Sequence, residues 1–512
     1  MYFSIAFPSH FQKLFSINFT LFYQRYIRCS LAKEVYFNYI FIFPTHMIKT
    51  KDKKMDDNKA EITLDQSRRD FIKKTVSLGV GVGLAGVAIN SCSPKKYAIA
   101  TKPGLPKIDP IPVVKIGFVG VGMQGSGHVH NFLNIEGVEI KAICDIIPEK
   151  VEKMQKLVVE KGHPKPMGYS KDEHDFKRMC ETEDLDLVFT ATPWNWHVPV
   201  MIAAMKNGKH AATEVPAAVT IDECWEMVET AEKYQKHCVM MENCNYNRME
   251  MLIFNMTRKG LFGELINAEC GYLHDLRKYK LGGLYEGDWR VKHSIDRNGN
   301  LYPTHGLGPV AQCMDINRGD QFDYLVSMSS NSRGLGLYAN KELGADHEYS
   351  KQKYALGDVN ISLIKTVKGL TITLYHDTNL PRPYSRKFTM QGTKGIAEGW
   401  PHRIHIEGKS PAHRWEELDS YYEEYEHPLW KKVGKDASWA GHGGMDFIED
   451  YRLIRALQTG TPTDMDVYDA AAQSCVSELT EISVANKSKP VDFPDFTRGL
   501  WKTREKLPII EP

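Results

Sequence analysis

The stretch from Val113 to Gly127, VVKIGFVGVGMQGSG, constrains the fold more than any other part of the sequence. An apolar, β-branched run bounded by turn residues is typical of a buried parallel strand. Behind it, Gly120, Gly122 and Gly125 have the spacing G-x-G-x-x-G, in which glycine permits a tight turn, close approach of the backbone to a pyrophosphate, and helix–strand packing. The helix that follows would direct its free N–H groups at the phosphates.

A second strand-like segment strengthens the prediction of a dinucleotide site. Residues 138–144 end at Asp145, about where the acid that binds the adenine ribose hydroxyls is expected. Because a carboxylate repels a 2′-phosphate, Asp145 favours NAD over NADP. An ordinary strand–turn–helix unit is the alternative explanation of the glycines, and the position of Asp145 argues against it.

The N-terminal part of the chain has the features of a targeting segment. Residues 1–46 are rich in Phe, Tyr and Ile and nearly free of acidic residues, so we expect the working protein to start at Met47 or Met55. Residues 67–74, SRRDFIKK, carry the paired arginines of a twin-arginine signal, and the apolar run over 76–89 is too short to span a bilayer. The sequence therefore predicts export by the twin-arginine machinery.

The end of this leader, Ile89-Asn90-Ser91-Cys92, resembles a lipoprotein processing site, although Asn90 is not one of the usual small residues. We expect cleavage near Cys92, whereas lipidation of Cys92 is left open; a lipid would anchor the protein without spanning the membrane. The expected location is the periplasm, or a membrane anchor on the outer side of the inner membrane or at the outer membrane. Outside the cytoplasm, NAD must stay bound and return to its starting oxidation state in every turnover.

Charge and cysteine content argue against several classes of partner. The net charge is +1 and no long basic run follows the signal, which argues against nucleic acid. The ten cysteines include no C-x-x-C pair, so neither a zinc site nor a disulfide framework is indicated. Several lie in apolar segments and are expected to be buried free thiols, namely Cys144, Cys180, Cys224, Cys238 and Cys313. His128, His130 and His442 lack matched carboxylates, so no metal is expected.

Strands and helices alternate after the glycine-rich turn, which predicts an α/β domain built on a doubly wound parallel sheet, the Rossmann fold. A helix is expected over 149–161, and the further strands are expected over 185–192, 210–213 and 237–242. Thr220 and Glu223 have the spacing of a capping box for a helix that runs to Lys236. Ligands bind at the carboxyl ends of such strands. The residues at these ends outline one crevice: Asp145, Trp194, His197, Glu214 and Asn243.

From about residue 246 the pattern changes to strands separated by turn signals. The strand-like segments are 263–275, 324–329, 359–366, 370–377 and 386–390. No long helices are expected between them, so we predict an α+β domain with a mostly antiparallel open sheet, one face of it against the nucleotide crevice, and closing helices over 444–457 and 467–485. The predicted organisation is a leader (1–92), a linker (93–112), a Rossmann domain (113–245) and a substrate-binding domain (246–512).

Residues 300–309, NLYPTHGLGP, are expected to form a rigid loop because they combine prolines and glycines. The loop contains His305, and histidine is a residue type suited to proton transfer near neutral pH. A capping or structural histidine is the alternative for most loop histidines.

Four motifs carry a resemblance to a known family: GVGMQGSGH (120–128), TPWNWH (192–197), EVP (214–216) and YPTH (302–305). They resemble the Gfo/Idh/MocA oxidoreductase superfamily and, more narrowly, glycoside hydrolase family 109, the NAD-dependent α-N-acetylgalactosaminidases of bacteria. The resemblance extends from about Val113 to the C-terminus, and its specificity comes mainly from the second domain. The superfamily fold implies the same two domains.

The resemblance also implies the residues of the site. With the glycines of the turn, the residues implied for NAD are Gly120, Gly122, Met123, Gln124, Gly125, Asp145, Trp194, Asn195, Trp196, His197, Glu214, Val215, Asn243 and Tyr302. Those implied for the sugar are Tyr272, Arg290, Tyr302, Pro303, Thr304, His305 and Tyr384. His305 is the expected catalytic base and Tyr302 a second candidate, while Arg290 and Tyr384 would hold sugar hydroxyls or the acetamide.

The activity implied by the resemblance is hydrolysis of terminal α-linked N-acetylgalactosamine from a glycan or glycoconjugate. Bound NAD takes hydride from carbon 3, a base removes the acidified proton on carbon 2, and the group on carbon 1 is expelled. Water then adds and the hydride returns, so the usual carboxylate pair is not used. Sugar dehydrogenases of the superfamily commonly carry Glu-Lys-Pro where this chain has Glu214-Val215-Pro216, and valine cannot assist proton removal. A plain dehydrogenase is therefore disfavoured.

Two other functions stay open. An exported oxidoreductase with tightly bound NAD(P) could exchange hydride between two sugars, as glucose–fructose oxidoreductase does, and a lipoprotein could bind glycans and hold NAD only structurally.

Residues 411–433, dense in Trp, Tyr and Glu, are expected to pack on the second domain or on a neighbouring subunit, the alternative being an aromatic platform for sugar rings. Formation of a homo-oligomer is therefore also left as an open alternative.

Overall fold

The structure is a computed structural model that describes residues 104–282 and 288–510. The described residues belong to one compact unit, 94–512. The twin-arginine signal, the apolar run behind it and Cys92 lie outside the described residues. In the described part of the chain, no helix combines the length and the apolar character that crossing a membrane requires.

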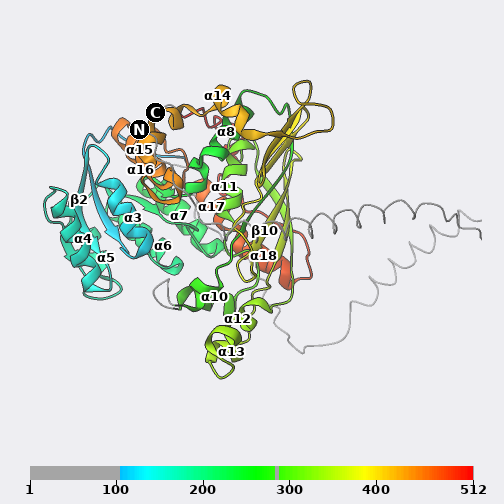
Figure 1. The fold of residues 1–512 in the computed structure, drawn as a ribbon. Coiled ribbons are helices and arrows are strands. Elements are labelled where there is room, and N and C mark those ends of the chain that lie inside the picture. The colour runs from blue at the N-terminus through cyan, green and yellow to red at the C-terminus, as the bar shows by residue number, and fades with distance from the viewer. Residues whose placement is uncertain (1–103, 283–287, 511–512) are drawn as a thin grey trace, which may run out of the picture. The chain divides into compact units, whose positions relative to one another are not determined.

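A parallel six-stranded sheet organises the first part of the described chain (Figure 1). Its strands are β1 (Val114–Val119), β2 (Val138–Cys144), β3 (Met167–Tyr169), β4 (Leu187–Thr190), β5 (His210–Thr213) and β6 (Cys238–Met240). The order β3-β2-β1-β4-β5-β6 places β2 and β4 on opposite sides of β1, which is the predicted doubly wound topology. Strands β4, β5 and β6 are buried at every residue because helices cover both faces of the sheet.

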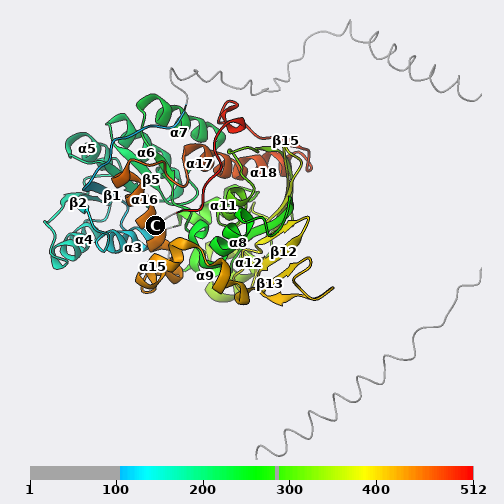
Figure 2. The ribbon, with the colours of Figure 1, turned by 90° about the horizontal axis from the view of Figure 1, so that it is seen from above.

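Five helices connect these strands: α3 (Met123–Phe132), α4 (Pro148–Glu160), α5 (Asp175–Thr182), α6 (His197–Lys206) and α7 (Ile221–Tyr234). Figure 2 shows α5, α6 and α7 on one side of the strands and α3 and α4 on the other. The predicted capping box starts α7, since Thr220 Oγ1 accepts from Glu223 N and Glu223 Oε2 accepts from Thr220 N. The predicted elements of this domain are confirmed to within two residues at each end.

The second sheet has nine strands in the order β14-β13-β12-β11-β7-β10-β9-β8-β15. They are β7 (Leu265–Leu273), β8 (Phe322–Ser329), β9 (Asn360–Thr366), β10 (Thr371–Asp377), β11 (Thr389–Gly392), β12 (Gly395–Gly399), β13 (His402–Ile406), β14 (Glu416–Glu417) and β15 (Val491–Asp492). Only the β7–β10 pair is parallel, so the predicted mostly antiparallel sheet is confirmed. β11 starts later than predicted because Lys387 adopts a left-handed conformation (φ 50°) that interrupts an extended strand.

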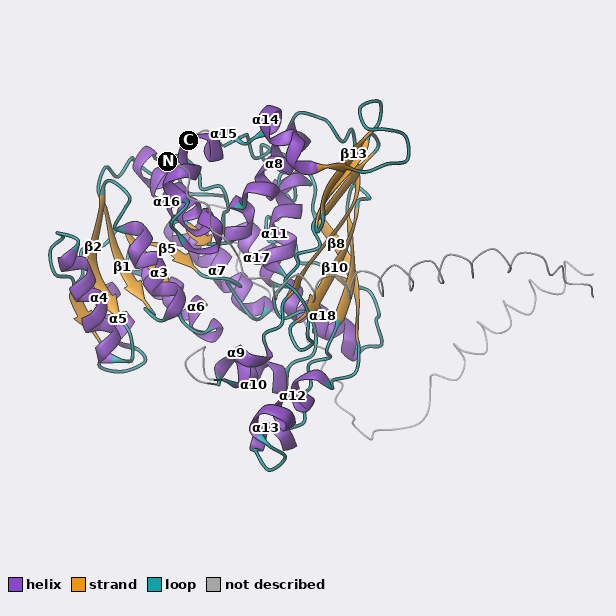
Figure 3. Cartoon of the chain, in the orientation of Figure 1, coloured by secondary structure: helices purple, strands orange, loops and turns teal. Residues whose placement is uncertain are grey.

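A layer of helices lies between the two sheets, as α8, α11 and α17 show in Figure 3. The layer consists of α8 (Arg248–Arg258), α11 (Thr304–Cys313), α17 (Val467–Ser474) and α18 (Val476–Ala485). The predicted contact of a sheet face with the crevice is limited to the end of β7, where Tyr272 reaches the crevice, because α11 packs on β7 and α18 on β8. Four other helices also intervene between strands: α9 (Arg277–Leu281), α10 (Trp289–Asp296), α12 (Gly334–Leu343) and α13 (Glu348–Lys351).

The predicted rigid loop over 300–309 is wrong from Thr304 onwards, where helix α11 begins. A Cβ on Gly306 would lie 2.4 Å from the backbone N of Gly271 in β7, so glycine lets this helix approach the strand closely. Packing against the sheet thus outweighs the low helix propensity of glycine and proline here.

Residues 411–433 pack on the second domain, in agreement with the first of the two predicted alternatives. They form β14, η3 (Leu418–Tyr421), α14 (Tyr422–Tyr425) and the start of α15 (Pro428–Ala437). Arg248 of α8 stacks on the Tyr422 ring at 4.2 Å and pairs with Glu426, and Tyr425 is buried in the core.

The chain then returns to the Rossmann domain through α15 and α16 (Met445–Thr459). Helix α16 packs against α3 and β1, and side chains of both helices share one core with the apolar residues of β1. This return covers a sheet face that would otherwise be exposed to water, and it carries C-terminal side chains to the nucleotide-binding turn.

Eight cysteines lie in the described part of the chain, and all of them are buried and free. The predicted buried free thiols are therefore confirmed. Burial raises the pKa of Cys180 to about 12, so this thiol stays protonated and unreactive.

Candidate active site

The glycine-rich turn connects β1 to α3 in a conformation that requires glycine. Gly120 has φ +80°, and a Cβ on it would lie 2.9 Å from the carbonyl oxygen of Ala191. A Cβ on Gly125 would lie 2.0 Å from the carbonyl oxygen of Gly120, so this glycine lets α3 approach β1. Gly122 precedes the first residue of α3, whose first turn holds no acidic side chain. The turn therefore leaves free N–H groups at a helix start for a phosphate.

Asp145 follows β2 and is fastened to the same turn. Its Oδ2 accepts from Val121 N at 2.9 Å, and its Oδ1 accepts from Ile147 N at 3.0 Å. A carboxylate has about four lone-pair positions, so two hydrogen bonds leave acceptor capacity for ribose hydroxyls. The glycine turn and Asp145 together fit a dinucleotide such as NAD.

A cavity of about 530 Å³ extends from this turn towards the second domain. Its volume is in the usual range for small-molecule sites. Fifteen of the residues predicted for NAD or sugar line it: Gly120, Gly122, Met123, Gln124, Asp145, Trp194, Trp196, His197, Glu214, Val215, Asn243, Tyr272, Arg290, Tyr302 and His305. Segments far apart in the sequence thus meet around one space.

Five predicted residues do not line the cavity. Gly125 serves the packing of α3, and Asn195 is exposed to solvent in the short helix η1 (Trp194–Trp196). Pro303 and Thr304 are buried at the start of α11. Tyr384 lies behind the wall, where its hydroxyl accepts from Arg386 and its ring centroid is 6.1 Å from that of Tyr272.

Several wall residues were not predicted. At the Asp145 end they include Ile146, Ile147, Lys150, Asp172, Glu173 and Phe176, and at the other end His274, Tyr279, Trp289 and His442. The position of Ile146 and Ile147 directly after a strand end was a usable signal, because ligands lie at such ends. His274 lies near the end of the predicted strand over 263–275, whereas Tyr279 and Trp289 come from segments that had no recognisable pattern.

Aromatic rings and one arginine form the wall opposite the nucleotide turn. The Tyr302 ring centroid lies 4.6 Å from that of Tyr272 and 5.6 Å from that of Trp194. The Arg290 guanidinium lies 5.0 Å from the Trp194 ring and 5.3 Å from the Tyr302 ring. Burial raises the pKa of the Tyr302 hydroxyl well above its usual value, so Tyr302 is a poor base at neutral pH.

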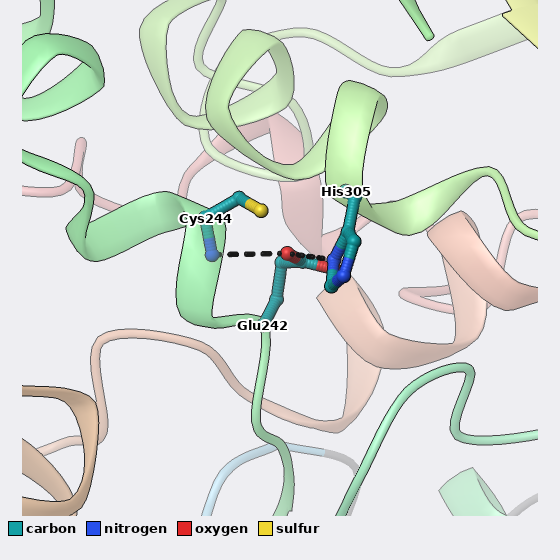
Figure 4. Close-up of side chains that lie close together, drawn as sticks. All are labelled: Glu242, Cys244 and His305. Atoms are coloured by element: carbon teal, nitrogen blue, oxygen red, sulfur yellow. Dashed lines mark hydrogen bonds and ion pairs between the residues drawn. The ribbon is translucent and has the colours of Figure 1, made fainter. Parts of the chain in front are cut away.

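His305 sits in the first turn of α11, and its ring is held by Glu242 (Figure 4). His305 Nδ1 donates to Glu242 Oε1 at 2.7 Å, and the amide of Cys244 donates to the same oxygen at 3.1 Å. The Glu242 side chain is completely buried, whereas His305 retains 13% exposure towards the cavity. Glu242 follows β6 directly before Asn243, so the strand-end rule that selected Asn243 could have found it.

His442 faces the same cavity from a turn between α15 and α16. His442, Gly443 and Gly444 have φ values of +51°, +73° and +101°, a left-handed run that glycine makes accessible. His442 Nδ1 donates to Asp446 Oδ2 at 2.7 Å, and Asn243 donates to the other oxygen of Asp446 at 2.7 Å. The hydrogen bond to Asp446 raises the pKa of His442 above its usual value. The earlier view that His442 has no matched carboxylate is thus wrong.

A buried chain of charges supports the floor of the cavity at Glu214. His128 of α3 lies between Glu214 and Asp450, with Nε2 2.9 Å from Glu214 Oε1 and Nδ1 2.9 Å from Asp450. Burial opposes the charge on His128, but the two carboxylates outweigh it and raise its pKa well above the usual value. The same pairing lowers the pKa of Glu214 to about 2 against the effect of burial. His128 therefore also has matched carboxylates, contrary to the prediction.

His197 has a structural position in addition to its place in the wall. Both ring nitrogens lie 2.8 Å from backbone carbonyl oxygens, those of Pro216 and Thr192. Burial lowers the pKa of His197, which disfavours a charged ring. The side chain thereby holds two strand-end loops of the nucleotide site together.

Two groups of potential metal ligands occur among the described residues: Glu242 with Cys244 and His305, and His128 with Glu449 and Asp450. In each group the histidine is already hydrogen-bonded to a carboxylate. Burial raises the pKa of Cys244 well above its usual value, which disfavours the thiolate that a metal needs. We assign no metal to either group.

Comparison with known proteins agrees with this architecture. Residues 114–242 match the oxidoreductase family with an NAD-binding Rossmann fold, and residues 246–503 match the C-terminal domain of glycosyl hydrolase 109. Solved structures similar in fold include levoglucosan dehydrogenase in complex with NADH and levoglucosan (TM-score 0.57, 19% identity, 74% of this chain and 99% of that chain) and an NAD binding oxidoreductase from Klebsiella pneumoniae (TM-score 0.59, 14% identity, 75% and 99%).

Sequence relatives are much closer. A glycosyl hydrolase family 109 protein of Shewanella pealeana is 49% identical over 454 residues, covering 87% of this chain and 99% of the relative. An alpha-N-acetylgalactosaminidase of Shewanella oneidensis is 46% identical over 455 residues, covering 86% and 98%. An NAD-binding Rossmann domain joined to this C-terminal domain over nearly the full length of the relatives leads to one conclusion: the chain belongs to glycosyl hydrolase family 109.

Proposed function

We propose that the chain is an exported glycosidase that removes terminal α-linked N-acetylgalactosamine by a redox-neutral, NAD-dependent cycle. The observation that carries the proposal is that one cavity is bordered by the nucleotide-binding turn and by two histidine–carboxylate pairs, His305–Glu242 and His442–Asp446. The name of the Shewanella oneidensis relative supports the choice of sugar.

The cofactor would lie along the Rossmann side of the cavity. Gly120 and Gly122 would receive the pyrophosphate and Asp145 the adenine ribose, with Phe176 and Trp196 beside the adenine ring. When bound, NAD would supply a reversible hydride acceptor for carbon 3 of the sugar, and the proton of the carbon 3 hydroxyl would pass to water and return when the ketone is reduced. Because the export signal would separate the enzyme from the cytoplasmic pool, we propose that the cofactor stays bound through every turnover.

Val215 is the residue that most disfavours a simple dehydrogenase. It is buried and lines the cavity between Glu214 and Pro216, so no lysine is available at that position to remove a hydroxyl proton. The buried ion pair of Glu214 with His128 also engages the neighbouring carboxylate. Of the four described histidines that line the cavity, burial lowers the pKa of His197 and His274, so His305 and His442 are the proton carriers in our proposal.

His305 would act on the proton of carbon 2. A ketone at carbon 3 makes this proton acidic, and a neutral imidazole with a free Nε2 is a suitable base near neutral pH. Since Glu242 accepts from Nδ1, the lone pair of the ring is on Nε2. Tyr302 beside it would bind sugar rather than remove the proton, because burial keeps its hydroxyl protonated.

His442 would donate a proton to the departing oxygen on carbon 1. A general acid must be protonated at working pH, and the hydrogen bond to Asp446 raises the pKa of His442 in that direction. Arg290, Tyr272 and Tyr302 would bind the hydroxyls and acetamide of the sugar, and Tyr384 would support Tyr272 from behind.

The test is an assay of purified protein with a panel of 4-nitrophenyl glycosides in deuterated buffer, with bound NAD quantified before and after turnover. We expect release of N-acetylgalactosamine from the α-anomer, deuterium at carbon 2 of the product, and unchanged total NAD. Cleavage without carbon 2 exchange, or full activity after removal of nicotinamide, would refute the mechanism. An oxidised sugar formed beside a reduced one would instead indicate hydride exchange between two sugars.

Export is proposed from the sequence of residues 67–74. Cell fractionation should find the full chain outside the cytoplasm, and the conservative double variant R68K/R69K should retain it inside. Incorporation of labelled fatty acid into the processed protein, and its absence from the Cys92→Ser variant, would establish lipidation of Cys92. Uptake that is the same in both forms would argue against an anchor at Cys92.

A further inference from the structure

We propose that Glu242 is a positioning residue that orients His305 and sets its tautomer for the glycosidase reaction. This inference rests on the proposed function, in which His305 carries the carbon 2 proton. Glu242 Oε1 receives the only hydrogen bond recorded from the His305 ring in the described structure, at 2.7 Å. A carboxylate that accepts at Nδ1 leaves Nε2 unprotonated on the opposite side of the ring, where His305 borders the cavity.

The burial of Glu242 indicates that this pairing is its main interaction. Its side chain has no exposure, and the Cys244 amide is the other donor to Oε1. The second oxygen, Oε2, is buried and has no hydrogen-bond partner among the described residues. A buried carboxylate with so few donors is stabilised by a positive neighbour. An imidazolium formed when His305 takes a proton is such a neighbour.

The packing of α11 keeps Glu242 in place. Gly308 lies one turn after His305, and a Cβ on it would be 2.8 Å from Glu242 Cγ and 2.8 Å from Asn245 Oδ1. The helix therefore rests directly on the Glu242 side chain, and glycine is the residue that makes the contact sterically possible. Gly308 offers a second test, because an added methyl group would push against the Glu242 side chain, and against Asn245, while the carboxylate of Glu242 stays chemically unchanged.

Other groups around His305 do not offer the same support. The rings of Tyr302 and Tyr272 approach it edge-on, with centroids at 4.9 Å and 5.3 Å. Burial and the positive charge of Arg290 lower the pKa of nearby His274, so His274 is neutral and adds little charge. Cys244 is held as a thiol by burial. Glu242 is thus the acidic side chain in contact with His305.

The experiment compares Glu242→Gln with the wild-type holoenzyme. We expect kcat to fall about 10- to 100-fold with KM unchanged, as for outer hydrogen-bond partners of other reactive side chains. ¹⁵N-histidine spectra, with His305 assigned from its absence in His305→Asn, should show Nε2 unprotonated in the wild type and a mixture of tautomers in the variant.

Glu232→Gln is the matched control. Glu232 is equally buried and is bonded to Tyr468 and Arg498, none of which lines the cavity. This control variant should lose as much stability as Glu242→Gln, but it should leave kcat and the His305 spectrum unchanged. Gly308→Ala covers the case in which Glu242→Gln does not fold, and should lower kcat with KM unchanged.

A wild-type tautomer and a wild-type kcat in Glu242→Gln, or in Gly308→Ala when that variant alone folds, would overturn the proposal. If the wild type cleaves no glycoside, the proposed function fails, yet the spectrum still decides whether Glu242 sets the tautomer of His305.

Discussion

Two of the histidines that line the cavity, His305 and His442, differ in how their carboxylate partners are held. His305 belongs to a helix packed in the centre of the molecule, and its partner Glu242 is fully buried at the end of a strand. His442 belongs to a glycine-rich turn, its side chain is 52% exposed, and its partner Asp446 is bonded to Asn243 as well. A rigid pair and a solvent-accessible pair therefore border the same space.

This difference suggests a division of labour. A buried pair fixes one tautomer and one direction for a proton, which suits a base acting on a carbon acid. An exposed pair with a raised pKa can exchange protons with water and keeps its proton to a higher pH than an unpaired histidine, which suits an acid. The predictions below test this division from the largest expected effect to the smallest.

His305→Ala should have the largest effect. Removing the base should lower kcat about 10²- to 10⁴-fold for every α-N-acetylgalactosaminide, whatever its leaving group, and should abolish deuterium incorporation at carbon 2. Steady-state kinetics and mass spectrometry of the product measure both. A kcat within tenfold of the wild type would exclude His305 as the base.

His442→Ala should have an effect that depends on the leaving group. An alkyl or sugar leaving group needs a proton, so kcat should fall about 10²- to 10⁴-fold, whereas 4-nitrophenolate leaves without one and should be affected far less. The measurement is the ratio of kcat/KM for the two substrate types in variant and wild type. Equal losses on both would contradict an acid role for His442.

Asp446→Asn should shift a pH profile. Asp446 raises the pKa of His442, and a general acid loses activity as the pH rises through its pKa. The variant lowers that pKa, so the basic limb of kcat/KM should move to lower pH, with a loss of about tenfold at the wild-type optimum. Because Asp446 also contacts Asn243, NAD affinity should be measured in parallel to separate a change in cofactor binding from the change in the pKa of His442. A basic limb that does not move would contradict the role of His442 as the acid.

Thr220→Ala should have the smallest effect on catalysis. Thr220 caps α7 on the Rossmann side and lines no part of the cavity. Loss of the cap should lower the free energy of unfolding by about 1 kcal/mol with kcat unchanged. Urea denaturation and the standard assay provide the baseline for the three site variants, and a drop in kcat here would show that stability alone moves activity.

Local patterns made much of the Rossmann domain predictable. The G-x-G-x-x-G turn, the apolar strands and the Thr220–Glu223 capping box each depend on residues within a few positions of one another, and each is present. Helix α11 was missed because Gly306 and Gly308 indicate a loop by propensity. Their function is instead to let the helix approach β7 and Glu242, which no local pattern shows.

The carboxylate partners were missed for the same reason. Glu242 and His305 are 63 residues apart, and His128 and Asp450 are 322 residues apart. His442 and Asp446 are only four apart, but a glycine turn rather than a helix brings them together, so helical spacing did not identify the pair.

By itself, the sequence determined the fold class, the nucleotide-binding turn and the family, because these depend on periodicity and on short motifs whose geometry is local. Only the tertiary structure decided which carboxylate holds which histidine and which predicted residues reach the cavity. Those pairings depend on how α11 and α16 pack against the sheets, and packing is the sum of many weak contacts between distant segments.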